Sequence, residues 1–351
     1  MQSDSPTPPQ APTVVLQPRD SMFGRFGKLL IVLLILCVLM MMGMASAYQE
    51  YFGETDGPAE SYHSLSKTAT SKIAIVTVKG AIMEGDDFIE KQLKKVKKDD
   101  SVVAVVLRIN SPGGTVTQSD RLHHLTKKLI EEREIPVVVS MGSLCASGGY
   151  YLAMAAGDQP DSLFAEPTTW TGSIGVVIPH YNLSLLMGVV GVRDQSITSG
   201  DLKLMGSPTR AMTDREREVL QTLVDESFEG FKDIVRDGRP ELAEDEAALD
   251  AVTTGQIFTA NQALELGLVD QLGFIEAAVE RAAELAGVST DEVRCVKYKK
   301  HVTPVEQILG AHSEPEPALS ATTGIKGVIE LSAPRAYYLC TVLPSLLEAS
   351  P

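Results

Sequence analysis

Residues Val137–Ala155 read VVVSMGSLCASGGYYLAMA, and the rest of the chain is organised around this stretch. An apolar run ends at a turn of small residues, and a new helix begins with two tyrosines. Gly148 and Gly149 follow Ser147, so the backbone can turn sharply there without the steric penalty of a Cβ atom. The first amides of a helix lack intrahelical partners and favour negative charge. A hydroxyl at this turn is therefore well placed to attack a carbonyl group, because the developing oxyanion lies beside preorganised donors.

The same turn also fits a simple packing role, in which Ser147 only caps the following helix. Three other segments favour a catalytic role instead. Asn110–Gly114 (NSPGG) follows one apolar run, and Thr171–Val176 (TGSIGV) follows another. Lys203 lies further along in the segment SGDLKLMGSPTR. Packing alone does not explain four such segments in this order, so we expect them to form one site.

The composition indicates a chain with a substantial folded core. Its 351 residues, 44% of them hydrophobic, suffice for one large domain or two small ones. A net charge of −15 and a pI near 4.9 argue against nucleic acid as a partner, since phosphate binding needs a basic surface. We expect no cofactor and no metal.

The four cysteines, Cys37, Cys145, Cys295 and Cys340, are widely spaced and indicate neither a disulfide framework nor a metal site. Cys145 stands two residues before Ser147 and is an alternative nucleophile. However, no histidine lies in a recognisable partner motif for a cysteine nucleophile. A buried small side chain is therefore the favoured interpretation of Cys145.

The N-terminal part of the chain predicts a membrane segment. Residues 1–28 are rich in Pro, Ser, Thr and Gln and predict a disordered cytoplasmic tail. Residues 29–47 carry no charge and are long enough for an α-helix that crosses the hydrocarbon core. Basic residues before this segment and acidic ones after it predict a cytoplasmic N-terminus and an extracytoplasmic domain. Ala45–Ala47 also fits a cleavage site, so a removed signal peptide is the alternative to a retained anchor.

The remaining chain divides into a polar linker over residues 48–71, a soluble domain over residues 72–300 and a C-terminal extension of unknown role over residues 301–351. Within the soluble domain, apolar runs alternate with amphipathic segments, which predicts an α/β domain with a largely parallel sheet. The predicted strands are Ile73–Val78, Val102–Ile109, Val137–Met141, Ser162–Ala165 and Gly172–Ile178. The predicted helices are Asp86–Lys98, Thr117–Glu132, Ser147–Ala155, Leu183–Val190, Thr213–Arg236, Ala260–Leu266 and Ile275–Ala286. Thr213 and Glu216 form a capping box at the start of the longest of these helices.

A serine nucleophile needs a base, and the sequence offers two candidates. Among six histidines, only His180 follows a strand of the predicted site, which leaves a Ser/His/Asp triad as an open alternative. Lys203 is the stronger candidate, because burial among its apolar neighbours would favour the neutral amine that can accept a proton. Ser173 has a hydroxyl that could hold this amine in place.

Together these motifs resemble the bacterial signal peptide peptidase family of membrane-anchored serine proteases. The resemblance covers roughly residues 72–286 and rests on NSPGGTV, CASGGYY, TGSIGV, SGDLK with GSPTRAMT, and ALELGLVDQLG. It implies that Ser147 is the nucleophile, Lys203 the general base and Ser173 the hydroxyl that orients the lysine. Gly114 resembles the residue whose backbone N–H helps to bind the oxyanion, and Gly148 supplies an amide from the nucleophile turn.

The resemblance also implies a crotonase/Clp-protease-like fold of repeated ββα units, preceded by one N-terminal transmembrane helix. Family members form homo-oligomers on the cell (inner) membrane, and in some the serine and lysine of one site come from neighbouring subunits. The implied substrates are signal peptides left in the membrane after secretion, or other exported hydrophobic peptides. The sequence departs from the family at residues 157–162, which look long, and beyond Lys300, where the family pattern stops.

Two other functions remain open at the level of sequence. An acyl-CoA enzyme on the same fold would use the glycine amides to bind a thioester oxyanion, but CoA is cytosolic and the domain is predicted to lie outside. A catalytically inactive membrane scaffold is the second alternative. The presence of Ser147, Lys203 and Gly114 together favours an active peptidase over this scaffold.

Overall fold

The computed structural model describes residues 22–52, 57–156, 159–300 and 336–340 of the chain. The chain divides into two compact units, Met1–Asp56 and Gly57–Pro351. Residues 157–158, the first part of the predicted tail and most of the C-terminal extension lie outside the described residues. The two units are taken separately.

The first unit contains one long helix, α1 (Met22–Phe52). Its 19-residue stretch Phe26–Met44 is apolar, wholly unburied and long enough to cross a membrane, although a signal sequence near an N-terminus has the same properties. The predicted apolar helix over residues 29–47 is therefore confirmed as a helix. α1 begins at Met22, so its first turns extend into the segment that we predicted as a disordered tail.

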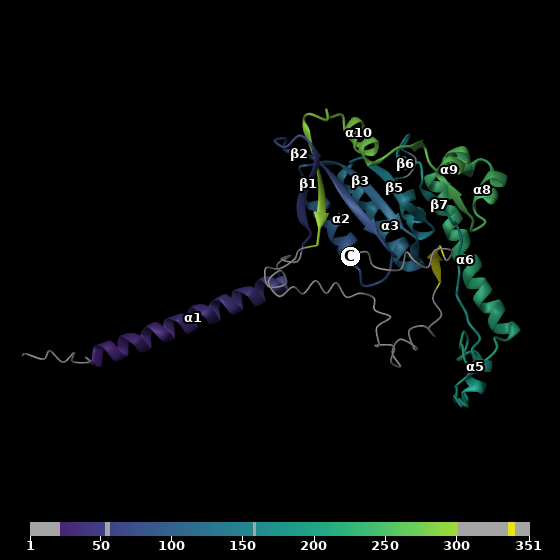
Figure 1. The fold of residues 1–351 in the computed structure, drawn as a ribbon, viewed down its shortest axis with the longest axis horizontal. Coiled ribbons are helices and arrows are strands. Elements are labelled where there is room, and N and C mark those ends of the chain that lie inside the picture. Colours follow the sequence, from purple (N-terminus) through teal and green to yellow (C-terminus); the bar gives the residue numbers. More distant parts are fainter. Residues whose placement is uncertain (1–21, 53–56, 157–158, 301–335, 341–351) are drawn as a thin grey trace, which may run out of the picture. The chain divides into compact units, whose positions relative to one another are not determined.

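The second unit is built around a nine-stranded sheet (Figure 1). Neighbouring strands pair in parallel, except at two pairs near the ends of the sheet, where β1 meets β10 and β7 meets β8. The main path runs β1 (Ala59–Leu65), β10 (Val293–Lys299), β2 (Ser71–Lys79), β3 (Val102–Ser111), β5 (Val137–Ala146), β6 (Leu163–Ala165) and β9 (Gln271–Leu272). β7 (Trp170–Gly172) pairs with the end of β5, and β8 (Ile257–Thr259) pairs with β7. This parallel-rich sheet confirms the predicted α/β class.

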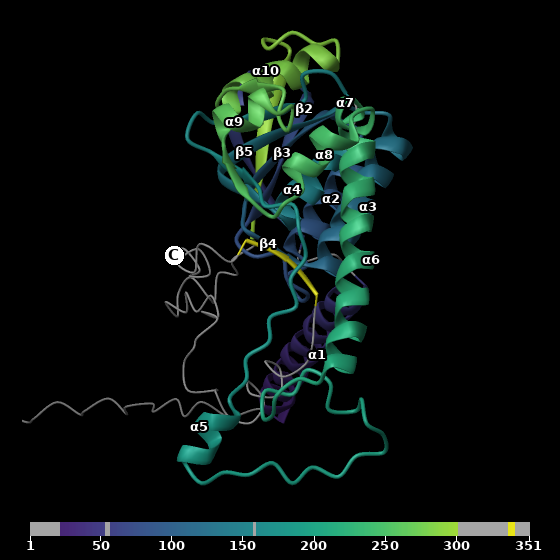
Figure 2. The ribbon, with the colours of Figure 1, turned by 90° about the vertical axis from the view of Figure 1, so that its right-hand side faces the viewer.

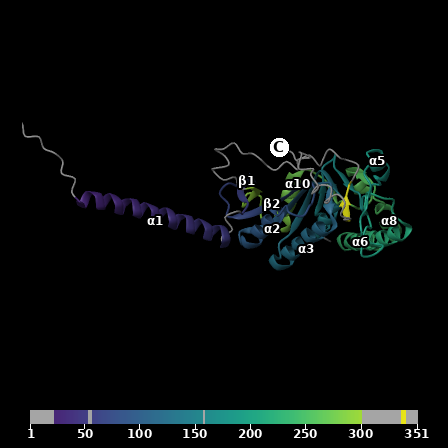
Figure 3. The same ribbon diagram turned by 90° about the horizontal axis from the view of Figure 1, so that it is seen from below.

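Helices cover both faces of the sheet, which explains why the central strands are almost continuously apolar. Successive side chains of a strand point to opposite faces. Val105 and Leu107 of β3 pack in the cluster that includes α2 (Phe88–Lys98) and α3 (Val116–Arg133). Ala104 and Val106 of β3 pack in a second cluster with α10 (Ile275–Leu285). Figure 3 shows α10 on one side of the strands and α2 and α3 on the other.

The long helix α6 (Asp214–Gly238) begins at the predicted capping box, in which the Thr213 hydroxyl accepts from Glu216 N and the Glu216 carboxylate accepts from Thr213 N. The segment before it, residues 177–212, includes α5 (Ser184–Val189) and extends away from the sheet together with the first turns of α6 (Figure 2). Because this segment projects from the sheet, it does not pack in the hydrophobic core that holds the rest of the unit together. The remaining short helices are α4 (Gly148–Ala153), α7 (Pro240–Ala243), α8 (Glu246–Val252) and α9 (Ala260–Glu265).

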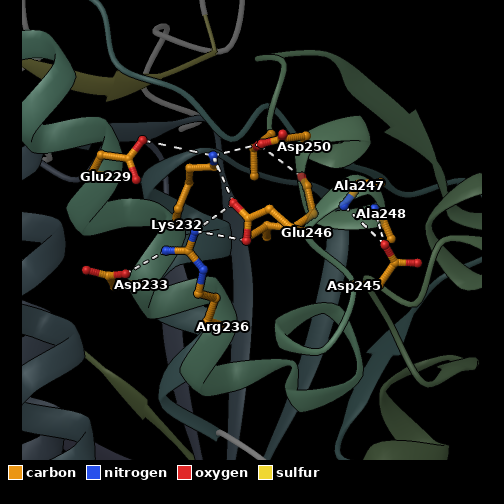
Figure 4. Close-up of polar contacts among 11 residues, drawn as sticks. Glu229, Lys232, Asp233, Arg236, Asp245, Glu246, Ala247, Ala248 and Asp250 are labelled. Atoms are coloured by element: carbon orange, nitrogen blue, oxygen red, sulfur yellow. Dashed lines mark hydrogen bonds and ion pairs between the residues drawn. The ribbon is translucent and has the colours of Figure 1, made fainter.

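Ion pairs fasten the C-terminal half of α6 to α8 (Figure 4). The Lys232 ammonium lies 2.8 Å from an Asp250 carboxylate oxygen and 3.7 Å from Glu246, and the Arg236 guanidinium lies 3.0 Å from Glu246. The Lys232 side chain is only 10% exposed. This arrangement raises the pKa of Lys232, chiefly through its hydrogen bond to Asp250, so the lysine stays charged and the pairing persists at neutral pH.

Two predicted elements differ from the structure for physical reasons. Residues 59–65, expected within a polar linker, form the strand β1. Its side chains are only partly buried, but its backbone N–H and C=O groups pair with those of β10, a strand that the sequence also did not predict. The predicted strand Gly172–Ile178 is shorter and begins earlier, as β7. Gly172 and Ser173 adopt positive φ angles of 81° and 50°, which end the extended backbone.

A second, two-stranded sheet joins parts of the chain that are far apart in sequence. β4 (Gly113–Thr115), from the NSPGG segment, pairs antiparallel with β11 (Tyr337–Leu339), from the C-terminal extension. The sequence had indicated no structure for this part of the extension. The pairing places a C-terminal strand directly against the glycines of the predicted site.

Candidate active site

Ser147 lies between β5 and α4 on a strained turn. Its backbone has φ 54° and ψ −117°, an unusual conformation for a residue with a side chain. Such a conformation costs about 1–3 kcal/mol, persists only where surrounding structure holds it, and clusters at functional sites. Here Ser147 N donates to Gly172 O over 2.8 Å, and Ser147 O accepts from Tyr151 N over 2.8 Å. The turn thus presents the serine at the junction of strand and helix.

Hydrogen bonds between strand ends hold this turn in place. The Thr171 hydroxyl of β7 donates to Cys145 O over 2.6 Å, and Asn110 Oδ1 accepts from Leu144 N over 3.1 Å. The Ser111 hydroxyl accepts from Gly113 N over 3.1 Å. Because β3, β5 and β7 are parallel, their carboxyl ends meet at one edge of the sheet. The predicted segments NSPGG, CASGG and TGSIG therefore converge there.

The glycines of this edge approach one another too closely for any other residue. A Cβ atom on Gly148 would overlap the Ser119 hydroxyl and lie 3.1 Å from Gly114 N. On Gly113, where φ is 95°, it would overlap Tyr338 O and lie 2.6 Å from Gly148 N. The structure therefore brings Gly114 and Gly148 together beside Ser147, which is the arrangement that two oxyanion donors require.

Ser173 also lies beside the nucleophile turn. It directly follows Gly172, whose carbonyl accepts from Ser147 N, and its own amide donates to Gln256 O over 2.7 Å. The side chain is nearly buried, with 8% of the residue exposed. The predicted lysine-orienting hydroxyl is thus next to Ser147 along the joined ends of β5 and β7.

Lys203 does not join these residues within a single chain. The Ser147 hydroxyl is buried and has no hydrogen-bond partner among the described residues. Lys203 is exposed, not buried as predicted, and lies in the turns between α5 and α6. Those turns belong to the segment that extends away from the sheet (Figure 2). Within the described part of one chain, Ser147 and Lys203 therefore lie on separate parts of the fold.

Neither alternative from the sequence is supported by the geometry. Cys145 is completely buried in the core, and burial raises the pKa of its thiol, which opposes formation of the reactive thiolate. Neither His180 Nε2 nor the Ser147 hydroxyl has a hydrogen-bond partner among the described residues, so the two are not bonded to each other. His123 is buried, with its ring against that of Tyr151. The described residues contain no cluster of His, Cys, Asp or Glu that could hold a metal ion.

β11 lies along this edge as an extended segment that sequence reasoning missed. Cys340 N donates to Pro112 O over 2.8 Å, and Val116 N donates to Ala336 O over 3.3 Å, on either side of the paired strands. On its other side, Tyr337 exchanges two backbone hydrogen bonds with Val177, of 2.9 and 3.0 Å. A strand of this chain thus sits between the glycine segment and the residues that follow β7.

The side chain of Tyr338 fills an aromatic socket behind β11. Its ring stacks on Tyr151 of α4 at 5.0 Å and packs against Phe231 of α6 at 4.6 Å, and its hydroxyl donates to Ser227 O over 2.9 Å. The tandem tyrosines of β11 were the only sequence signal for this contact. They could not reveal it, because pairing between residues so distant in the chain leaves no local pattern.

The chain is similar to known peptidases. Residues 130–289 match the model of Peptidase family S49. The chain is 39% identical over 249 residues to the putative protease slr0021 of Synechocystis, a match that covers 71% of this chain and 87% of that protein. It is 36% identical to the putative signal peptide peptidase SppA of Enterococcus faecium, over 60% of this chain and 59% of that protein.

The chain is also 32% identical to Protease 4 of Haemophilus influenzae, over 63% of this chain but only 36% of that longer protein. The match to each of the last two relatives thus spans less than two thirds of their length. The family match covers the Ser147 turn and the strands β5 to β9. This chain therefore belongs to peptidase family S49, the signal peptide peptidase family of serine peptidases with a Clp-protease-like α/β fold.

Proposed function

We propose that this protein is a membrane-bound serine endopeptidase in which Ser147 of one subunit acts with Lys203 of a neighbouring subunit on hydrophobic peptides, remnant signal peptides among them. The observation that carries the proposal is the unpaired, buried Ser147 hydroxyl on a strained turn beside the Gly114 and Gly148 amides. A buried hydroxyl without a hydrogen-bond partner is unfavourable unless a group from outside the described chain bonds to it. A general base supplied by a second copy would do so.

The surface around Lys203 supports a second copy as the source of the base. Large apolar side chains of the projecting segment are exposed, including Leu185 and Val189 of α5 and the neighbouring Ile197. Exposed apolar clusters of this kind mark interaction sites. Burial of the segment against a neighbouring subunit would also desolvate Lys203, and desolvation favours the neutral amine that can act as a base.

The proposed mechanism runs as follows. The neutral Lys203 amine takes the Ser147 proton while the serine oxygen attacks a peptide carbonyl carbon, and the carbonyl π electrons move to its oxygen. The amides near Gly114 and Gly148 hold this oxyanion, and Ser173 orients the lysine. Lys203 then protonates the leaving amine, and water hydrolyses the acyl-enzyme.

β11 supports an extended binding mode for the peptide. A strand at this position pairs with β4, and its Tyr338 carbonyl oxygen occupies the place where a side chain of Gly113 would begin. Addition of a strand to a sheet edge is a common way to bind peptides irrespective of most side chains. We propose that substrates bind along β4 in the same way, so that a substrate displaces β11.

We further propose that α1 is a retained single-pass anchor, with the N-terminus in the cytoplasm and the peptidase unit outside. Its charge-free length supports anchoring, and the basic residues before it support this orientation. The peptidase unit extends beyond residues 72–300, because β1 belongs to its main sheet and β11 to its site. A catalytically inactive scaffold is the alternative that the experiment below separates from the peptidase.

The test uses the full chain in detergent and a hydrophobic fluorogenic peptide. Ser147→Ala and Lys203→Ala are each expected to lose about 10⁶-fold in kcat. Co-assembly of the two inactive variants in equal amounts should restore about one quarter of the parent activity, because a quarter of the interfaces then pair an intact serine with an intact lysine. No recovery on mixing would contradict the shared site, and an inactive parent of normal assembly would favour the scaffold.

A further inference from the structure

Ser119 of α3 is a second buried serine whose hydroxyl has no hydrogen-bond partner among the described residues. None of its surface is exposed. A serine or threonine inside a helix commonly donates to the carbonyl four residues earlier, and Thr126 of the same helix does so to Leu122 O over 2.8 Å. Ser119 makes no such bond. Because an unsatisfied buried hydroxyl is unfavourable, its retention calls for an explanation.

The position of Ser119 supplies one. Its hydroxyl occupies the place where a side chain of Gly148 would begin, and the same place lies 3.1 Å from Gly114 N and 3.2 Å from Gly113 Cα. The hydroxyl therefore lies at the meeting point of the two segments whose amides form the proposed oxyanion hole. A Cβ atom on Gly113 would overlap the Tyr338 carbonyl oxygen of β11 and lie 2.6 Å from Gly148 N, so β11 also approaches this point.

Close packing accounts for the size of Ser119 but not for its hydroxyl. The approach of α3 to α4 requires a small residue opposite Gly148, and alanine would meet that requirement without a buried polar atom. Ser162 provides a comparison, since it is also fully buried with an unpaired hydroxyl. Its carbonyl accepts from Val139 N near the start of β5, at the opposite end of the strand from Ser147.

We propose that Ser119 is a further catalytic residue, whose hydroxyl donates a hydrogen bond to the oxyanion alongside the Gly114 and Gly148 amides. The inference rests on the proposed function. Ser119 keeps its proton throughout, while the Ser147 proton passes to Lys203 and the carbonyl π electrons become the oxyanion that Ser119 stabilises. Because the hydroxyl is unpaired in the resting site and paired in the tetrahedral intermediate, its bond contributes to the transition state and not to substrate binding.

The test compares Ser119→Ala with Ser162→Ala in the full chain in detergent, using a hydrophobic peptide and a peptide aldehyde that forms a hemiacetal with Ser147. Loss of one oxyanion donor typically lowers kcat by about 10²–10³-fold. We expect a loss of about 100-fold in kcat for Ser119→Ala, an unchanged KM and a similarly weakened affinity for the aldehyde. Ser162→Ala should leave all three unchanged, and the melting temperature of neither variant should fall.

The inference is overturned if Ser119→Ala keeps its kcat, or if only KM changes. If Ser119→Ala fails to fold, Ser119→Cys decides, because a thiol is a much weaker donor; an unchanged kcat in that variant would overturn the inference. Ser147→Ala distinguishes a failure of the proposed function from a failure of this inference alone. Hydrolysis that survives Ser147→Ala overturns the proposed function and this inference together, whereas loss in Ser147→Ala with full activity in Ser119→Ala overturns this inference alone.

Discussion

The ring of Tyr338 stacks on the ring of Tyr151 with centroids 5.0 Å apart and an angle of 22° between the planes. Tyr151 belongs to α4, the helix that follows Ser147, whereas Tyr338 comes from the C-terminal strand β11. The contact therefore ties the C-terminal part of the chain to the nucleophile turn. It also anchors β11 on the glycine strand along which we propose that substrates bind.

Tyr338→Ala should raise peptidase activity at low substrate concentration. Loss of the aromatic contacts and of the bond to Ser227 O weakens β11, so a peptide competes for β4 more readily. We expect a several-fold lower KM with little change in kcat, which steady-state kinetics would measure. Tyr337→Ala is the matched control, because its ring takes no part in the socket and its backbone bonds remain. A KM that stays the same or rises in Tyr338→Ala would contradict this prediction.

Gly113→Ala should abolish most activity and destabilise the unit. A Cβ atom there would overlap backbone atoms, and the positive φ of Gly113 adds strain for any other residue. We expect kcat to fall at least 100-fold, as for loss of an oxyanion donor. Gly230→Ala is the control, since nothing lies within 4 Å of its new Cβ inside α6. That variant should gain about 0.5–1 kcal/mol in stability by denaturant titration with unchanged activity. Equal behaviour of the two variants would show that the close approach is unimportant.

Cys145→Ala should keep its activity within a few-fold, unlike Ser147→Ala. Its thiol is completely buried, and desolvation raises its pKa, so the group is neither accessible nor ionised. Thiol alkylation of the folded protein should likewise leave hydrolysis unaffected. The check is the residual rate after treatment with iodoacetamide, alongside the two variants. If activity were lost at the same rate as Cys145 is modified, the result would identify Cys145 as the nucleophile.

His123 should make the folded protein less stable as the pH falls from about 6.5 toward 4. Burial, with a smaller effect from Lys127, lowers the His123 pKa to about 4 in the folded state, below its usual value of 6.5. Between these two pH values His123 is protonated in the unfolded chain but not in the folded one. The free energy of unfolding therefore carries no penalty from His123 above about pH 6.5 and declines below it. The slope from this one group is at most about 1.4 kcal/mol per pH unit.

Denaturant titrations at several pH values would measure that slope. His123→Gln should flatten it, whereas His124→Gln should not, because His124 is the neighbouring exposed histidine. An identical slope in the two variants would mean that His123 is not the group responsible.

Much of the molecule could be predicted from local sequence. The strands β3 and β5 lie where continuous apolar runs indicated, because burial on both faces demands such runs. The capping box of α6 and the apolar helix α1 are equally local. The convergence of NSPGG, CASGG and TGSIG follows from their positions after parallel strands, whose carboxyl ends share one edge.

Only the tertiary structure decided how distant segments meet. β1 and β10 have no strong strand pattern and become strands because each satisfies the other's backbone. β11 lies on β4 through pairing across more than two hundred residues, and Ser119 faces Gly148 through the packing of α3 on α4. The sequence by itself determined the small-residue turn at Ser147 and the α/β class, since both depend on neighbouring residues. The surroundings of the turn, and the separation of Lys203 from it within one chain, arise from non-local contacts that no local periodicity records.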